Sequence, residues 1–388
     1  MADVQSAELI AKVRTLQVSR RRFMRGVAGA GAGAVVASQW GSAGAQSGTP
    51  TGDFDVVYSG EVFDAEGETL RVASWGGFWE ETERKFLLDQ LEKDFNCKVS
   101  YDSSWPWFPK FVAGGVDNPP FDVANWNLPE LFKTARADEF FVPVDEVRAN
   151  VPNSADLWDF AYRNGLGITY LFSQYGYAYR TDTGVPAPTQ FTDFWAEHFA
   201  NKRGTFITSN TLQAVFFMMA SAAFGEDEKD IDAGVQAMED AMPMKISDFT
   251  GNMQTLLERG EVEICVQHDG EPYAQMDRGI PVGWMYWTER TPILTQTKTV
   301  SMGSNDVQKR LAYAYINRAC SPEFQESMAR EQYLRPTNVT AELPQNLSDK
   351  GIQTGADAMD KLWIPDWNWY LDNEQDIVER VNEIFGQG

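Results

Sequence analysis

The fold class of this chain is indicated by one stretch, Leu70-Arg71-Val72-Ala73-Ser74-Trp75-Gly76-Gly77. Its first six residues have the composition of a strand, and the two glycines predict a turn where that strand ends. Residues 78–95 follow with apolar side chains at helical spacing and with acidic residues early, which is the pattern of a helix start. A strand that leads directly into a helix is the unit of a parallel sheet covered by helices, so we expect an α/β fold.

Strands and helices continue to alternate along the chain. Further strands are expected at 98–101, 121–126, 167–180, 204–207, 262–267, 282–287 and 299–302. Further helices are expected at 107–113, 128–137, 191–198, 212–224, 234–241, 252–259, 307–320, 322–331 and 374–385. Because the segments after about residue 295 return to the first unit, we expect two lobes joined by two crossovers. Such crossovers act as a hinge beside a cleft.

Domain boundaries follow from the order of these segments. Residues 69–172 and 295–340 are assigned to lobe 1, and residues 175–290 to lobe 2. Residues 46–68 are polar and glycine-rich and predict a linker, whereas residues 341–388 form a C-terminal helical tail. The length of the chain exceeds what one hydrophobic core usually serves, which agrees with two lobes.

The first 45 residues have the features of a twin-arginine export signal. The paired arginines lie in Ser19-Arg20-Arg21-Arg22-Phe23-Met24-Arg25, a weakly apolar run covers 26–38, and Ala43-Gly44-Ala45 is a small-residue cleavage site. The apolar run is too short to span a bilayer. We therefore expect cleavage after Ala45, export by the twin-arginine pathway and a periplasmic location.

Composition and motifs exclude several classes of function. The formal charge is −23, and residues 1–45 hold six basic and two acidic side chains, which leaves about −27 on the rest of the chain. A protein this negative is a poor partner for nucleic acid or for an anionic membrane surface. The three cysteines and two histidines lack metal-site or haem spacing, and cofactor and hydrolase motifs are missing, so we expect no metal, cofactor or catalysis. A disulfide between two of the cysteines stays open.

The expected elements, in their order, resemble the periplasmic solute-binding proteins of ABC importers, specifically the family-1 branch that includes polyamine binders. The segments that carry this resemblance are Val72-Ala73-Ser74-Trp75, Phe121-Asp122-Val123, Ile168-Thr169-Tyr170, Tyr175-Gly176-Tyr177, Phe194-Trp195 before Arg203-Gly204, Glu258-Arg259-Gly260-Glu261-Val262 and Pro336-Thr337-Asn338. The resemblance implies a two-lobed periplasmic binding protein of type II, which closes on a small solute and delivers it to a permease in the inner membrane. It also implies a monomer without enzyme activity.

Ligand-binding residues are expected where the strands end. Trp75 and Gly76 follow the first strand and Asn127 follows the strand at 121–126, at the carboxyl ends where open α/β sheets bind ligands. Trp75 also resembles a tryptophan that lines the family's cleft, and Asn127 resembles a small polar cleft residue. Ser209-Asn210-Thr211 begin a helix, where backbone donors suit an anion or a carbonyl oxygen, although ordinary helix capping explains these residues as well.

The chain departs from the polyamine pattern near the second crossover. Gln296, Thr297 and Lys298 stand where those relatives carry an acid, and Arg335 adds a second cation beside Pro336-Thr337-Asn338. A cleft lined by unpaired Lys298 and Arg335 would favour a carboxylate or phosphonate, because buried cations without partners are costly. We therefore expect an anionic or zwitterionic solute, with a polyamine such as spermidine or putrescine as the alternative.

Further residues could complete the site. His268 and Asp269 end the strand at 262–267, and with Glu271 they could serve the amine group of a zwitterion. Trp369, in the C-terminal tail, could reach the cleft. Two alternatives stay open: a sugar ligand, because thirteen tryptophans supply stacking surfaces, and an exported enzyme, which turnover of a ligand would reveal.

Overall fold

The computed structural model describes residues 58, 61–287, 290–350, 352 and 356–386. The expected export signal and most of the expected linker lie outside the described residues. The described end of that linker belongs to the folded body, because Ala65 is buried and Phe63 packs against the core beside the first strand.

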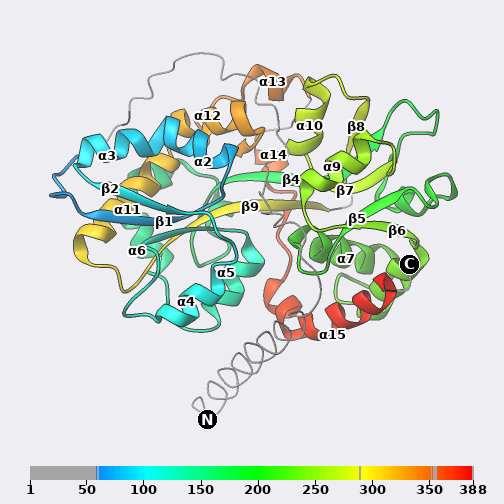
Figure 1. Cartoon of the computed structure of the whole chain (residues 1–388), viewed down its shortest axis with the longest axis horizontal. Helices are drawn as coiled ribbons and strands as arrows, with labels where there is room; N and C mark the ends of the chain where they lie inside the picture. The colour runs from blue at the N-terminus through cyan, green and yellow to red at the C-terminus, as the bar shows by residue number, and fades with distance from the viewer. Residues whose placement is uncertain (1–57, 59–60, 288–289, 351, 353–355, 387–388) are drawn as a thin grey trace, which may run out of the picture. The chain divides into compact units, whose positions relative to one another are not determined.

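Strands and helices alternate as the sequence predicts (Figure 1). The strands are β1 (Thr69–Ala73), β2 (Lys98–Asp102), β3 (Val123–Trp126), β4 (Ile168–Arg180), β5 (Arg203–Phe206), β6 (Met244–Ser247), β7 (Ile264–His268), β8 (Val282–Tyr286), β9 (Thr291–Val300), β10 (Arg335–Pro336) and β11 (Leu362–Trp363). The helices are α2 (Phe78–Glu83), α3 (Asp89–Phe95), α4 (Phe108–Gly114), α5 (Leu128–Ala135), α6 (Val144–Ala149), α7 (Thr211–Phe224), α8 (Ile231–Asp240), α9 (Thr250–Glu258), α10 (Gly270–Asp277), α11 (Asp306–Ala319), α12 (Pro322–Gln332), α13 (Gln345–Ser348), α14 (Ala356–Met359) and α15 (Trp367–Phe385). A π-helical segment, Arg84–Leu88, joins α2 to α3.

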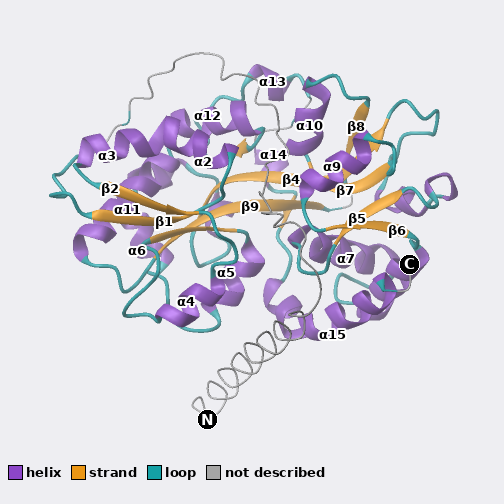
Figure 2. Ribbon diagram, in the orientation of Figure 1, coloured by secondary structure: helices purple, strands orange, loops and turns teal. Residues whose placement is uncertain are grey.

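The strands form one sheet in the order β2-β1-β3-β9-β4-β7-β5-β6, with β8 and β10 paired to β4 and β11 paired to β9. Strands β1, β2 and β3 are mutually parallel, as are β5, β6 and β7, whereas β9 runs antiparallel to β3 and β4 antiparallel to β9 and β7. Helices cover both faces of this sheet (Figure 2). The α/β expectation is therefore confirmed.

Strand β4 belongs to both halves of the sheet. Its residues Ile168–Gln174 pair with β9, and its residues Tyr175–Tyr179 pair with β7. We call β1, β2, β3, β9 and residues 168–174 the first half-sheet, and β5 to β8 with residues 175–180 the second half-sheet. The chain passes to the second half-sheet through β4 and returns between β8 and β9, which agrees with a two-lobed fold that has two crossovers. The lobe boundaries expected from the sequence remain a prediction.

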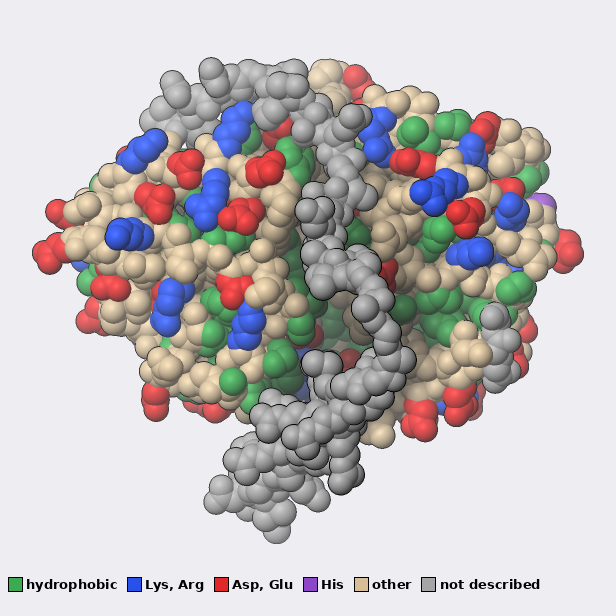
Figure 3. Space-filling view, viewed as in Figure 1, with side chains coloured by type: hydrophobic (Ala, Val, Ile, Leu, Met, Phe, Trp, Pro, Cys, Tyr) green, Lys and Arg blue, Asp and Glu red, His purple; other side chains and the backbone are tan. Residues whose placement is uncertain are grey.

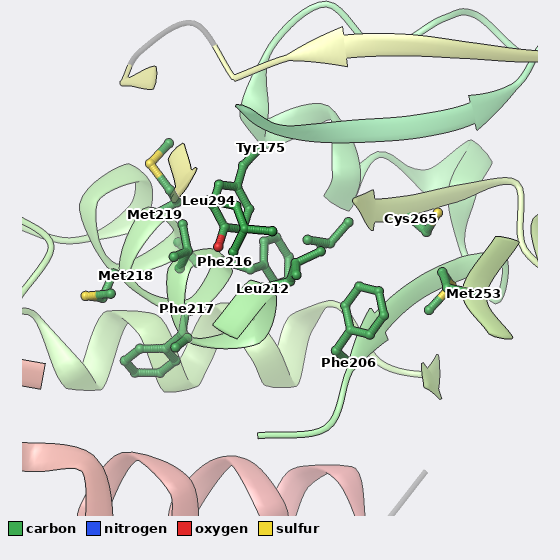
Figure 4. Close-up of a cluster of buried hydrophobic side chains, with 14 of the residues drawn as sticks. Tyr175, Phe206, Leu212, Phe216, Phe217, Met218, Met219, Met253, Cys265 and Leu294 are labelled. Carbon is green, nitrogen blue, oxygen red and sulfur yellow. The ribbon is translucent and has the colours of Figure 1, made fainter. Parts of the chain in front are cut away.

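The second half-sheet packs on a helix that is apolar on all sides. The ten residues from Leu212 to Ser221 of α7 are all buried, which is the behaviour of a helix enclosed by other elements. Phe216 and Met219 of α7 lie near Tyr175 of β4 and Leu294 of β9 in the same hydrophobic cluster (Figure 4). This cluster therefore extends from the second half-sheet to the strands that connect the two halves.

Three expected elements differ from those observed. The helix expected at 191–198 consists of two short 3-10 helices, Phe191–Trp195 and Glu197–Phe199. The short strand expected at 299–302 is the end of a longer one, β9, which begins at Thr291. Its polar residues, among them Thr295, Gln296 and Lys298, are buried, so polarity concealed the strand. The terminal helix expected at 374–385 begins at Trp367, because the side chain of Asp366 accepts a hydrogen bond from the backbone N–H of Trp369 and caps it.

Candidate functional site

The carboxyl ends of the parallel strands lie beside the shared strand β4. In the first half-sheet, β3 ends at Trp126, next to the part of β9 that pairs with residues 171–174 of β4. In the second half-sheet, β7 ends at His268, which pairs with Tyr175. The surface is hollowed along the line between the two halves, and hydrophobic side chains are visible in this recess (Figure 3). This region is the candidate ligand site.

Trp75 is held from two sides at this region. Its indole N–H donates to Oε1 of Gln296 at 2.6 Å, and its backbone carbonyl accepts from the hydroxyl of Tyr101 at 2.6 Å. Its ring lies 5.2 Å from that of Trp105 and 5.0 Å from that of Trp107, between ring centroids. Trp105 is 43% exposed, so this three-tryptophan cluster presents an aromatic surface to solvent.

The loop after β1 requires glycine at position 76. A Cβ placed on Gly76 would lie 2.9 Å from both the Cβ and the Oγ of Ser103, closer than side-chain carbons approach. The close approach brings the β1 loop against the loop after β2, which also carries Trp105. Gly76 therefore shapes the loop that positions Trp75.

Polar groups without hydrogen-bond partners accompany Trp75. Asn125 donates from Nδ2 to Oε1 of Gln296 at 3.0 Å, and its own Oδ1 is buried and has no partner in the described part of the chain. The Oδ1 of Asn127 is likewise buried and unpaired, as are the hydroxyls of Ser173 and Tyr175. An unpaired buried polar atom is costly, and a ligand that supplies its partner removes the cost.

Strand register places these groups on one face. Asn125 and Asn127 are two residues apart on and just after β3, and Ser173 and Tyr175 are two apart on β4. Ser173 pairs with Leu294, which lies on the same face of β9 as Gln296. Asn125, Ser173 and Gln296 thus share one face of the ladder that joins the two halves, and Lys298, which lies opposite Asn125, shares it too.

Lys298 is not an unpaired cation in a cleft, so this premise of the sequence analysis is wrong. Its side chain is 0% exposed, and its Nζ lies 2.8 Å from Oε1 of Glu83 and 2.6 Å from the hydroxyl of Tyr315. Burial alone would raise the pKa of Glu83, but the ion pair with Lys298 and hydrogen bonds from Lys298, Tyr315 and Tyr101 lower it below its ordinary value. The two charges neutralise each other inside the first half-sheet's core.

Arg335 is not an unpaired cation either. Its Nη1 lies 2.6 Å from Oδ2 of Asp269, its Nη2 donates to the hydroxyl of Tyr286 at 2.6 Å, and both charged residues are at most 2% exposed. Strand β10, which carries Arg335, pairs with the first-half part of β4, whereas Asp269 follows β7 of the second half-sheet. The pair therefore joins the two halves, and two residues expected to meet a ligand separately meet each other.

His268 lies beside this ion pair, at the end of β7. Its Nε2 is 3.8 Å from Oε1 of Glu271, and its Nδ1 is buried without a partner among the described residues. Glu271 accepts from the hydroxyl of Thr250 at 2.8 Å and from Gln254, so neutral donors hold it.

The helix start at Ser209-Asn210-Thr211 is capped from within the chain. The side chain of Asn210 accepts from the backbone N–H of Leu212 at 2.9 Å, whereas Ser209 is exposed. This hydrogen bond shows that the segment caps the helix in the ordinary way, and its contact with a ligand stays a prediction.

Trp369 lies in the first turn of α15. The Nζ of Lys229, in the loop between α7 and α8, lies 5.9 Å from the centroid of its ring. Trp369 also packs against the hydrophobic cluster that contains α7. These contacts set Trp369 against the second half; contact with a ligand in the cleft stays a prediction.

The described residues show no disulfide: Cys97, Cys265 and Cys320 are free and buried. No group of three or more metal-ligating side chains was found among the described residues, and none of the described helices is long and apolar enough to cross a membrane.

Sequence reasoning missed several residues that the structure brings together. Asn125 alternates with Asn127, so the period of a strand would have placed both on one face. In the sequence analysis, Gln296 was named only as one of the residues that stand where the polyamine-binding relatives carry an acid. Its contact with Trp75 joins positions 221 residues apart, which no local pattern reveals.

Comparison with known proteins supports the fold. No protein-family model and no curated protein sequence matches this chain. An extracellular solute-binding protein from Bordetella parapertussis is 23% identical, with a TM-score of 0.68 over 81% of this chain and 98% of that one. A spermidine/putrescine ABC transporter substrate-binding protein from Streptococcus pneumoniae is 18% identical, with a TM-score of 0.65 over 82% of this chain and 100% of that one.

A third solved structure is the binding protein AgtB from A. tumefaciens R10 in complex with agropinic acid. It is 18% identical, with a TM-score of 0.63 over 82% of this chain and 98% of that one. Identities this low establish shared architecture. The chain has the two-lobed α/β fold found in the extracellular substrate-binding proteins of ABC transporters.

Proposed function

We propose that this protein is the substrate-binding component of an ABC transporter, which captures a small polar solute outside the cytoplasm and delivers it to a membrane permease. The observation that carries this proposal is the row of unpaired polar groups on the strands that join the two halves, beside the three-tryptophan cluster. Groups contributed by both half-sheets can enclose a solute when the halves approach. The shared fold supports the same role, and neither observation implies catalysis.

Lys298 and Arg335, from which the sequence analysis predicted an anionic or zwitterionic solute, do not determine the charge of the solute. Lys298 and Arg335 are already paired with Glu83 and Asp269, so neither is a free charge for an anion or a phosphonate, although the Nε of Arg335 is a buried donor without a partner among the described residues. The solved structures of this fold include a spermidine/putrescine binding protein, a GABA receptor and a complex with agropinic acid. We therefore propose a polar organic solute and keep a zwitterion and a polyamine as the classes to test.

Binding is tested with the chain from Gln46 onward, purified without denaturation. Native mass spectrometry identifies any solute that co-purifies, and isothermal titration with 4-aminobutyrate, spermidine, glucose and succinate measures affinity. We expect one class to bind and small-angle scattering to show a more compact particle when it does. A chain that binds no solute and keeps one scattering profile throughout would refute the proposal, whereas chemical conversion of a bound solute would favour the exported enzyme.

The expected export route is tested in cells. Replacing Arg20 and Arg21 with lysine keeps the charge but removes the twin-arginine pair, so the protein is expected to accumulate in the cytoplasm. Replacing Arg25 with lysine is the matched control and leaves the pair intact. Equal periplasmic amounts of both variants would show that export does not use this pathway.

A further inference from the structure

The three side chains of Trp75, Gln296 and Asn125 form a chain of hydrogen bonds whose direction is fixed by chemistry. An indole nitrogen only donates, so the atom of Gln296 that it meets at 2.6 Å is the amide oxygen. Asn125 meets the same oxygen at 3.0 Å, so it contributes its amide nitrogen. The carbonyl oxygen of Asn125 is consequently the atom that remains without a partner.

This orientation has a consequence for the solute. Asn125 is 0% exposed, and its free Oδ1 can only accept a hydrogen bond. The neighbouring Oδ1 of Asn127, on the same face, is also an unpaired acceptor. A carboxylate placed against two acceptor oxygens has no proton to offer, whereas an ammonium, amide or hydroxyl group has.

Charge does not alter this preference. Lys298, which lies opposite Asn125, and Arg335, which lies opposite Phe172, are each neutralised by an acid. The Nε of Arg335 is a buried donor without a partner among the described residues, but it belongs to a group whose charge is balanced. The hydroxyls of Ser173 and Tyr175, on the same face, are neutral and can donate or accept. Because the free oxygens of Asn125 and Asn127 only accept hydrogen bonds, the end of a solute that carries N–H or O–H donors is the end that fits against them.

We propose that Trp75, acting through Gln296, orients Asn125 so that the site selects solutes which present N–H or O–H donors to the Asn125 and Asn127 oxygens. Trp75 is in this respect a positioning residue, because it acts on the solute through Asn125. The inference rests on the proposed function and names the class of solute for that same site.

The test compares ligands in which methyl groups replace the hydrogens of the donors while the net charge stays the same. The probes are 4-aminobutyrate with its trimethylammonium analogue, which keeps the charge but has no N–H, and glucose with its fully O-methylated ether. Succinate is the dianion without donors. We expect the donor-bearing member of the pair that binds to be favoured about tenfold or more by titration, the effect of one or two hydrogen bonds.

Variants then separate positioning from structure. Trp75→Phe keeps an aromatic ring but frees Gln296 to turn, so the tenfold preference is expected to fall toward unity; Gln296→Leu is expected to do the same. Gln296→Glu retains an acceptor for both Trp75 and Asn125 and should keep the preference. Trp195→Phe is the matched control: its indole N–H donates to the carbonyl of Ala237 at 2.7 Å, away from the strands that join the halves.

Each outcome of these measurements either supports or overturns the inference about donor-bearing solutes. Tight binding of succinate or of the methylated probes, or an equal loss of preference in Trp75→Phe and Trp195→Phe, would overturn the inference and leave the proposed function standing. The identity of a co-purified solute adds an independent decision, because a solute without N–H or O–H donors contradicts the inference. If no probe binds and nothing co-purifies, the proposed function fails and the inference fails with it.

Discussion

Removing the charge of Lys298 should destabilise this protein more than removing any surface lysine. In Lys298→Met, the carboxylate of Glu83 stays buried, at 0% side-chain exposure, without its cation. Breaking a buried pair in this way costs about 3–5 kcal/mol, because the remaining charge is uncompensated. The Nζ of Lys298 also lies 4.5 Å and 4.3 Å from the ring centroids of Tyr170 and Tyr315, so cation–π attraction is lost as well.

Urea unfolding of the chain from Gln46 onward, followed by tryptophan fluorescence, measures this loss. Lys110→Met is the matched control, because Lys110 pairs with Asp102 at 2.8 Å but both side chains are about a third exposed. That variant should lose about 1 kcal/mol or less. The double variant Glu83→Leu/Lys298→Met should recover most of the stability, since no charge is then buried. Equal losses for Lys298→Met and Lys110→Met would refute the reasoning.

The same pair predicts a pH dependence. The pKa of Glu83 is lowered in the folded protein, so its contribution to stability is present above its unfolded pKa and is lost as the pH falls. In Lys298→Met, the hydrogen bonds from Tyr315 and Tyr101 remain but the cation is gone, so burial, the largest cause of the shift, is expected to raise the pKa of Glu83. The penalty is then present at neutral pH and vanishes once Glu83 is protonated. The difference in the free energy of unfolding between wild type and variant should therefore narrow from about pH 7 to about pH 4. A constant difference would contradict the assignment.

Three further predictions follow from the contacts between distant segments. Arg335→Met strands the buried carboxylate of Asp269 and should cost about 3–5 kcal/mol in urea unfolding, most of it recovered when Asp269→Asn is added; no recovery would argue against the pair. Lys133→Ala with Arg136→Ala removes partly exposed ion pairs to Glu374 and Asp372 of α15 and two hydrogen bonds from Arg136 to Asn368, so the melting temperature should fall by a few degrees at low salt and by less at about 1 M salt; an equal fall at both salt concentrations would exclude an ionic contribution. Burial raises the pKa of Cys97 to about 11 and that of the other two thiols further, so a chromogenic disulfide reagent should label the native chain slowly and the denatured chain at all three cysteines; rapid labelling of the native chain would show that the thiols are accessible.

Local sequence patterns predicted most of the fold. The strand at Leu70–Trp75 and the apolar helix at 212–224 were expected nearly where they occur, because burial on one side or on all sides leaves a periodic or continuous apolar pattern. Strand β9 was recognised only at its end, because a strand whose buried positions are polar has no such pattern. The side chains of Gln296, Thr297, Lys298 and Thr299 find hydrogen-bond partners among other buried groups, whereas the hydroxyl of Thr295 has none among the described residues.

Local sequence patterns likewise predicted some residues of the candidate site and missed others. Trp75 and Asn127 could be nominated from sequence because they follow strands, and strand ends are a local feature. Whether a charged residue is free depends instead on its spatial partner: Glu83 lies 215 residues from Lys298.

The sequence by itself determined the class of the fold, the order of its elements and the uncharged or aromatic residues at the strand ends, since these depend on neighbours within a few positions. Only the tertiary structure decided the electrostatics of the site. Coulomb attraction in a buried environment acts between atoms a few ångströms apart, whatever their separation along the chain. This attraction pairs Lys298 with Glu83 and Arg335 with Asp269, so neither is a free cation. The hydrogen bond between Trp75 and Gln296 leaves the Oδ1 of Asn125 as an acceptor without a donor among the described residues.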